Sequence, residues 1–250
     1  MTEEQQFLQN YKPSDYKKPS VTADIVIFTV TEHDQLAVLL IKRNGHPYKD
    51  KWAIPGGFLN VDCESLDETA ARELQEETGV TNAKLTQLYT FSKPDRDPRM
   101  HVISTAYTAL VPKDNLHIQS GDDAKCAELF VIQTIGTEYV FLNQNHVLKE
   151  SELAFDHKDI IRMAITRLKN RIQYEPDAFA LLKNPESFTI YELKRIYETI
   201  LNTRLDNGNF RKQFHQNYLT NGIITKTGQT RKDKGRKEAA LYCYHSESNE

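Results

Sequence analysis

The sequence predicts an α/β (α+β) domain, with a mixed β-sheet sandwiched by helices, followed by a smaller domain of two helices and a hairpin. Several β-branched and apolar runs, separated by polar turns, predict the strands. Two segments with apolar residues at helical spacing, one between strands and one after the last strand, predict helices on the two faces of the sheet. After Pro185 the pattern changes to two further helical segments and a hairpin, which indicates a second domain.

The first two predicted strands, Val21–Val30 and Leu36–Lys42, are separated by the polar segment TEHDQ, which favours a hairpin. Three further apolar runs are predicted as strands: Leu85–Phe91, Val102–Val111 and Ala127–Ile132. The segment Asp159–Ile172 has apolar residues at helical spacing, so we expect it to cover the second face of the sheet. Residues 133–158 show no pattern that assigns them to an element.

The most informative segment is an acidic helix that begins after Ser65 and ends at Gly79. Ser65 followed by Glu68 forms a capping box, and a glycine supplies the left-handed stop. Three glutamates fall on one side of this helix, beside its apolar stripe: Glu73, Glu76 and Glu77. Like charges at these spacings repel by about 0.2–0.5 kcal/mol per pair. Clustered carboxylates suit Mg²⁺ or Mn²⁺, so a divalent cation is the predicted cofactor.

The same residues allow a second interpretation. The helix could be an ordinary exposed acidic helix in which Arg72 pairs with Glu76 one turn later. The glycine loop that ends at Gly57, just before the helix, favours a site over a plain surface helix.

From Glu64 to Val80 the chain resembles the Nudix hydrolase family, whose signature is Gly, five residues, Glu, seven residues, Arg-Glu-apolar-x-Glu-Glu-x-Gly-apolar. The resemblance implies that the three glutamates hold divalent metal against a pyrophosphate and that Arg72 orients one of them. It also implies that water attacks a nucleoside diphosphate linked to another group, with Glu76 or Glu77 positioning that water. Six residues, not five, separate Gly57 from Glu64, so the role of Glu64 stays open.

Composition sets broad limits on the kind of protein. With 250 residues and 39% hydrophobic residues the chain can fill a core, and no segment approaches the ~18 apolar residues of a membrane span. Residues 1–20 are polar, without the apolar core of a signal peptide, and are expected to form a flexible tail. Three cysteines without CxxC spacing argue against a disulfide framework or a zinc site, so a reducing cytoplasm is expected.

Charge is segregated along the chain. The formal net charge is −3, but the segment from Arg204 to Lys237 carries nine Lys and Arg against two Asp, so it is +7 and the remainder is −10. This distribution suggests an acidic-centred enzyme domain joined to a basic binding module.

The basic segment has the order of a winged helix-turn-helix. Thr189 with Glu192 forms a second capping box, Asp206 can cap a second helix over 207–218, and a hairpin with a basic tip follows. We therefore predict a double-stranded DNA-binding domain at 185–250, a connector at 173–184 and the larger domain at 21–172. The predicted DNA contacts are the basic residues of the second helix and of the hairpin: Arg211, Lys212, His215, Arg231, Lys232, Lys234, Arg236 and Lys237. The alternative is a solvated basic loop beside an ordinary helical pair.

The whole order resembles the Nudix-related transcriptional regulators, a bacterial family with a Nudix domain followed by a winged helix. The matching segments are Trp52–Gly57, Leu88–Phe91, Pro94–Arg99 (PDRDPR), Ala154–His157 (AFDH) and Ser187–Arg211. The resemblance implies a regulator that senses ADP-ribose and controls NAD metabolism, with relatives that respond to sugars. If the chain is a ligand-gated transcription factor, we expect a homodimer with two winged helices. No chemistry is assigned to His157.

The PDRDPR loop is the most family-specific of these segments. Arg96 and Arg99 can present guanidinium groups to a phosphate, and with Gly57 and Asp95 they form the predicted substrate site. The loop could instead be a rigid surface turn with internal Arg–Asp pairs.

Two hypotheses of different class follow, and both can hold. The first is an Mg²⁺-dependent enzyme that binds and hydrolyses an ADP-ribose-like substrate. The second is a ligand-gated transcription factor with little or no hydrolase activity. A third, an RNA-directed Nudix enzyme, would use the basic module without sequence preference.

Overall fold

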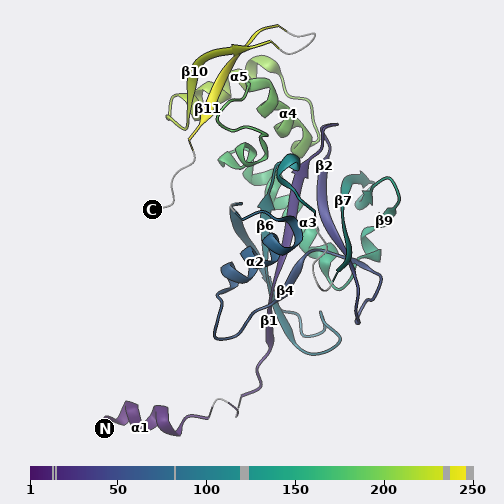
Figure 1. Cartoon of the computed structure of the whole chain (residues 1–250), viewed down its shortest axis with the longest axis vertical. Helices are drawn as coiled ribbons and strands as arrows, with labels where there is room; N and C mark the ends of the chain where they lie inside the picture. The colour runs from purple at the N-terminus through teal and green to yellow at the C-terminus, as the bar shows by residue number, and fades with distance from the viewer. Residues whose placement is uncertain (13, 15, 82, 119–123, 233–236, 246–250) are drawn as a thin grey trace.

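The computed structural model describes residues 1–250 except 13, 15, 82, 119–123, 233–236 and 246–250. A sheet with helices on its faces forms the larger part of the molecule, and the C-terminal helices and hairpin lie at one end of it (Figure 1). Among the described residues, no helix has both the length and the hydrophobicity that a membrane span requires.

The central sheet is mixed, as predicted. Its strand order is β5-β6-β1-β2-β7-β8-β9, and β1 pairs parallel to β6 while the other neighbours along this path pair antiparallel. The short strands β3 and β4 pair with β2 and β1. The strand bounds are β1 Ser20–Val30, β2 Leu36–Arg43, β3 Trp52–Ala53, β4 Gly56–Phe58, β5 Leu85–Phe91, β6 Val102–Leu110, β7 Ala124–Ile135, β8 Glu138–Leu142 and β9 Val147–Lys149.

Two helices cover the two faces of this sheet. Alternate residues of β1 point to opposite faces, so Ile25 packs in one core cluster with Leu74 of α2 (Leu66–Thr78). Val26 belongs to the other cluster, with Ile161 of α3 (His157–Arg171). Both predicted helices are therefore confirmed, and Ser65 and Gly79 cap α2 as predicted.

The structure also contains elements that the sequence did not reveal. The unassigned stretch 133–158 holds the end of β7, the strands β8 and β9, and a 3-10 turn at Glu150–Glu152. Gly136, with φ 62°, supplies the turn between β7 and β8. Within the expected tail, α1 (Glu3–Asn10) forms on a local capping box at Thr2 and buries none of its residues.

The C-terminal part has the predicted order of two helices and a hairpin. Thr189 caps α4 (Ile190–Leu201), and Asp206 caps α5 (Asn207–Phe214). The second helix was predicted to run to residue 218, but after Phe214 it continues as a π-helical turn, His215–Leu219. The hairpin consists of β10 (Ile224–Arg231) and β11 (Ala239–Tyr244).

The segment predicted as a connector contributes to the core. A 3-10 helix, Pro176–Leu181, buries Phe179, whose ring stacks on Tyr244 with 4.4 Å between centroids and meets Tyr218 edge-on at 5.0 Å. The apolar residues of this turn are too few to show a period, which is why the sequence pattern did not indicate their burial.

The two parts of the molecule also touch at the turn between β1 and β2. The Asp34 carboxylate forms an ion pair with Arg195 of α4. The Asp34 carbonyl accepts a hydrogen bond of 3.1 Å from the Thr199 hydroxyl on the same helix. One end of β1 is thus fixed to the C-terminal domain.

Replacing Phe179 with Ala should destabilise the C-terminal domain by about 3–5 kcal/mol, because the cavity would remove the contacts with Tyr244 and Tyr218. Urea unfolding followed by tyrosine fluorescence measures the loss. Tyr174→Ala, at an exposed ring in the same segment, is the control. An equal effect of both changes would show that the turn is only a linker.

Candidate functional site

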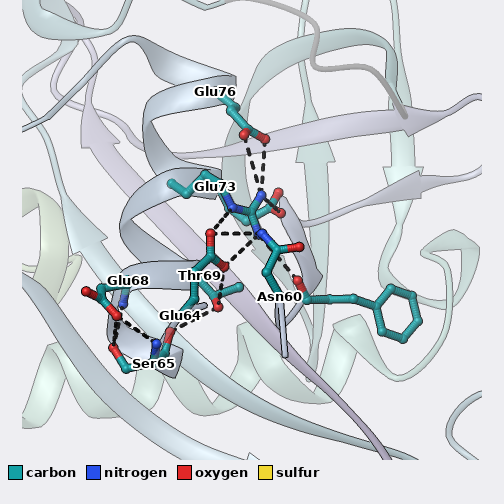
Figure 2. A network of polar contacts seen from close by, with 9 residues as sticks. Asn60, Glu64, Ser65, Glu68, Thr69, Glu73 and Glu76 are labelled. Atoms are coloured by element: carbon teal, nitrogen blue, oxygen red, sulfur yellow. Dashed lines mark hydrogen bonds and ion pairs between the residues drawn. The ribbon is translucent and has the colours of Figure 1, made fainter. Parts of the chain in front are cut away.

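Glu64, Glu73 and Glu76, labelled in Figure 2, all contact the guanidinium of Arg72, which is the centre of the polar network on helix α2. The Nε of Arg72 donates to Glu64 at 2.8 Å and its Nη1 donates to Glu73 at 2.7 Å, while the contact with Glu76 is longer at 3.4 Å. The predicted alternative, an Arg72–Glu76 pair, is therefore present, but it is the longest of the three. One guanidinium offsets the repulsion of several carboxylates.

Glu64 keeps its contact with Arg72 despite the longer loop before it. Its carboxylate also accepts hydrogen bonds from Asn60 at 2.9 Å and from Thr69 at 3.0 Å. The bond from Arg72 holds the pKa of Glu64 down at about 2. Asp62, in the loop between Gly57 and Glu64, has a left-handed φ of 68°. Glu64 thus fixes the position of Arg72.

The three predicted metal ligands line one cleft of about 340 Å³, together with Arg72 and Gly57. The Glu73 side chain is 12% exposed and that of Glu76 is 51% exposed, while the residue Glu77 is 5% exposed. Burial raises the pKa of Glu73, and Arg72 opposes that rise. A larger cavity of about 660 Å³ lies where the two domains meet, and none of the predicted acids lines it.

Gly57 is required by the close approach of Glu73. A Cβ atom at Gly57 would lie 1.8 Å from the Oε1 atom of Glu73, which is far inside contact distance. The absence of a side chain at Gly57 therefore leaves room for the Glu73 carboxylate, and a larger residue there would displace it.

The donor set fits a hard divalent cation in its chemistry. The described residues contain no group of three or more His, Cys, Asp or Glu side chains arranged to hold a metal, and Arg72 contacts both Glu73 and Glu76. Carboxylate oxygens are nevertheless the ligands that Mg²⁺ and Mn²⁺ prefer, and three carboxylates line the same cleft. Glu73 and Glu76 would have to turn from the guanidinium towards the metal.

Arg96 lies in the wall of the cleft and is held by the protein's own acids. It is buried, and it makes two bonds to Asp156, of 2.8 and 3.0 Å, and one of 3.2 Å to Asp24. Ser104 donates to the same Asp24 oxygen at 2.5 Å. Burial alone would lower the pKa of Arg96, but the bonds to Asp156 and Asp24 raise it. Arg96 therefore joins the PDRDPR loop to β1 and to the start of α3.

Of the other two predicted residues of this loop, Arg99 lines the cleft and Asp95 does not. Arg99 pairs with Asp97 at 2.8 Å and lies over the Phe58 ring at 5.4 Å. Asp95 is exposed and is not among the residues that line the cleft, where Asp97 stands instead. An internal Arg–Asp pair of the alternative interpretation is thus present at Arg99, whereas the acids that hold Arg96 lie outside the loop.

Several cleft residues were missed by sequence reasoning. His157, to which no chemistry was assigned, is buried, and its Nδ1 accepts a 3.0 Å hydrogen bond from the Ile54 amide. Burial lowers the pKa of His157, which keeps the ring neutral. Asp24 had an available signal, since it is the one acid within the apolar run Val21–Val30. Phe155 lies in the matching AFDH segment but was assigned no role, and Arg43 had no signal.

The predicted DNA contacts differ in exposure and in the partners they have within the protein. Arg211 and Lys212 are exposed on α5, His215 is half-buried, and Lys232 and Lys237 are exposed near the ends of the hairpin strands. Arg231 pairs with Glu192 of α4 at 2.6 Å, which ties the hairpin to that helix. Two further predicted contacts lie outside the described residues: Lys234 and Arg236.

The fold and the acidic cleft define this chain as a Nudix protein, and comparison with known proteins shows the same. The chain belongs to the Nudix family: the family model described as NUDIX domain matches residues 18–150. A second model, described as NrtR DNA-binding winged helix domain, matches residues 178–244. The C-terminal match begins within the 3-10 helix that was predicted as part of a connector.

Among characterised relatives, the chain is similar to the ADPR responsive transcriptional repressor NtrR of Acinetobacter baylyi. The two are 34% identical over 96% of this chain and 88% of the relative. An ADP-ribose pyrophosphatase of Methanocaldococcus jannaschii is 39% identical over 59% of this chain and 73% of that protein.

Solved structures cover nearly the whole chain. A MutT/nudix family protein from Enterococcus faecalis aligns with a TM-score of 0.79 and 32% identity, over 97% of this chain and 92% of that one. Shewanella oneidensis NrtR, solved with a 27mer DNA, aligns with a TM-score of 0.69 and 31% identity, over 90% and 93%.

Replacing His157 with Asn should flatten the acid side of the pH–stability profile. The pKa of the native imidazole lies below its ordinary 6.5, so the unfolded chain takes up a proton that the native chain does not. Stability from this group is full above pH 6.5 and is lost as the pH falls below it, by at most about 1.4 kcal/mol per pH unit.

Urea unfolding of both proteins at pH 7.5 and 5.5 measures this difference. Asn can keep an acceptor near Nδ1 for the Ile54 amide. His33→Asn, in the β1–β2 turn, is the matched control. Parallel pH profiles for wild type and His157→Asn would show that the buried imidazole titrates normally.

Proposed function

We propose that this chain is a DNA-binding regulator that responds to a nucleoside diphosphate sugar of the ADP-ribose class. The ligand would bind in the Nudix cleft, and the winged helix would bind double-stranded DNA. The observation that carries the proposal is the path of β1. One end of this strand carries Asp24 in the cleft wall, and the turn after the other end carries Asp34 against α4.

The contacts along this path provide a means of coupling. Asp24 accepts hydrogen bonds from Arg96 and Ser104. A ligand that binds Arg96 would weaken the Arg96–Asp24 contact and so change how β1 is held. Asp34 is bonded to Arg195 and Thr199, so a shift of the turn would reach the helix that packs under α5. A ligand biases an equilibrium only through different contacts in the two states, and the Arg96 ion pairs offer such a difference.

The C-terminal domain supports the DNA-binding part of the proposal. Arg211 and Lys212 are exposed on α5, whose Phe210 and Phe214 are buried, so both basic side chains could reach bases or phosphates. The Shewanella oneidensis relative was solved with DNA. We propose a cytoplasmic homodimer, because two winged helices would read two half-sites of an operator.

Hydrolysis is a second proposed activity of the same cleft, and the complete acidic set favours it. Glu73, Glu76 and Glu77 would hold Mg²⁺ or Mn²⁺, which when bound neutralises phosphoryl charge and lowers the pKa of a water. Arg72 holds Glu73 in place by a hydrogen bond, and Glu64 fixes Arg72. Glu76 or Glu77 would orient the attacking water. The relative from Methanocaldococcus jannaschii carries the name of such an enzyme.

The regulator proposal is tested by mobility shift with the chain's own upstream DNA, Mg²⁺ and a panel of nucleoside diphosphate sugars. We expect binding of DNA and a change of about 5- to 150-fold in its affinity when ADP-ribose is added. Arg195→Gln should keep DNA binding but lose most of this change, because it breaks the contact with Asp34.

Arg204→Gln, at an exposed position just after α4, is the matched control and should retain the ligand effect. If none of the nucleotide sugars changes the affinity for DNA in the mobility-shift assay, the regulatory proposal is wrong. If the affinity is the same for different DNA sequences but falls steeply with salt, the RNA-directed or non-specific alternative is favoured.

The hydrolase proposal is tested by nucleotide chromatography of the same reaction mixtures that are used for the mobility shift. Glu77→Gln should lower turnover of ADP-ribose by about 100-fold or more, because it removes a charged ligand of the metal. Glu138→Gln, at an exposed position on β8, should turn over normally. Circular dichroism would confirm that both variants fold. Undiminished turnover in Glu77→Gln would take away its assigned role.

A further inference from the structure

A second group of side chains lines the cleft on the β2 side, away from the acids on α2. We name it the aromatic corner, and its members are Arg43, Tyr48, Phe155 and His157. Arg43 ends β2, Tyr48 lies in the loop after it, and the other two stand at the start of α3. All but Tyr48 line the cleft that also holds the glutamates.

The corner is arranged for stacking on flat rings. The Arg43 guanidinium carbon lies 4.9 Å from the centroid of the Phe155 ring, and the Tyr48 ring meets Phe155 edge-on at 4.7 Å. The His157 ring is tilted by 34° against Phe155 at 5.2 Å. Buried Ile41 and Ile54 add apolar walls to the same part of the cleft. Cationic and aromatic faces against apolar walls suit a planar heterocycle.

The backbone of the corner is strained. Tyr48 and Phe155 have φ values of 58° and 52°, in the left-handed region that bulky side chains rarely adopt. Phe155 packs against the small core cluster of Ile41, Ala53 and Ala154, which holds it in this conformation. Strain of this kind persists where surrounding packing fixes it, and it gathers at ligand clamps. The two strained residues are the two rings in edge contact.

His157 adds a polar group of defined direction. Because its Nδ1 accepts from the Ile54 amide, the hydrogen of the neutral ring lies on Nε2. His157 lines the cleft, so this N–H can donate to an acceptor nitrogen of a heterocycle or to a ribose oxygen.

We propose that the aromatic corner binds the nucleobase of the ligand, with a purine ring stacked on the Arg43–Phe155 pair and His157 donating a hydrogen bond. This inference rests on the proposed function and adds the site that selects the base. A nucleoside diphosphate sugar would then lie with its pyrophosphate at the glutamates and its base on the β2 side.

The cleft offers one competing place for a ring. Phe58 lies beneath Arg99 with 5.4 Å between the guanidinium carbon and the ring centroid. Phe58 is 41% exposed and neighbours polar Asn60 in the cleft lining, whereas the corner has buried apolar walls. Burial favours the corner for the base and leaves the Phe58 side to the more polar terminal sugar.

The test is calorimetry with two probes that differ only by an adenosine: α,β-methylene ADP and methylenediphosphonate, each with Mg²⁺. Phe155→Leu should lower the affinity for α,β-methylene ADP by about 5-fold or more, because the stacking partner of the base is lost. The affinity for methylenediphosphonate should stay unchanged, because this probe has no base. Phe155→Tyr keeps the ring and should bind as wild type. Tyr89→Leu, at an exposed ring on β5 outside the cleft, is the matched control.

Each other outcome counts against the inference in a recognisable way. If Phe155→Leu lowers the affinity for both probes equally, Phe155 maintains the structure of the cleft and does not contact the base. If Phe58→Leu gives the selective loss instead, the base lies on the opposite side. If wild type binds both probes equally well, no base site exists while the phosphate site stands. If wild type binds neither probe, the proposed function itself fails.

Discussion

The neutralisation of crowded carboxylates by Arg72 is the interaction on which the site depends. Glu64, Glu73 and Glu76 all contact this one guanidinium, and the resulting charge balance allows α2 to place its acids beside the sheet. Without it, like charges at helical spacing would oppose the helix and the burial of Glu73.

The strand β1 is the second constraint. It pairs with β2, β4 and β6, and its two faces supply Ile25 and Val26 to different core clusters. The larger cluster extends without a break from the sheet through α3 to Phe188 and Tyr242 of the winged helix. The two domains are therefore packed as one body around β1 and α3, and the cleft and the DNA-binding surface share that body.

The PDRDPR loop shows how a motif can be satisfied in two ways. Arginine forks suit phosphate, but they suit carboxylate equally well. In this fold Asp156 and Asp24 reach Arg96, and Asp97 reaches Arg99, so the protein's own acids meet both guanidinium groups. The residue types were read correctly from the sequence, and Arg99 pairs within the loop, but the partners of Arg96 lie 60 and 72 positions away in the chain.

The sequence by itself determined the features that depend on near neighbours. The capping boxes at Ser65 and Thr189 and the left-handed end at Gly79 involve residues three or four apart, and each stands as predicted. The order of sheet, acidic helix, two helices and hairpin also follows from local periodicity. Tertiary structure decided the rest, because burial of His157, the Asp24–Arg96 bond, the Phe179 contacts and the aromatic corner all join segments distant in sequence. Such contacts depend on how the chain packs, and no spacing along one segment encodes them.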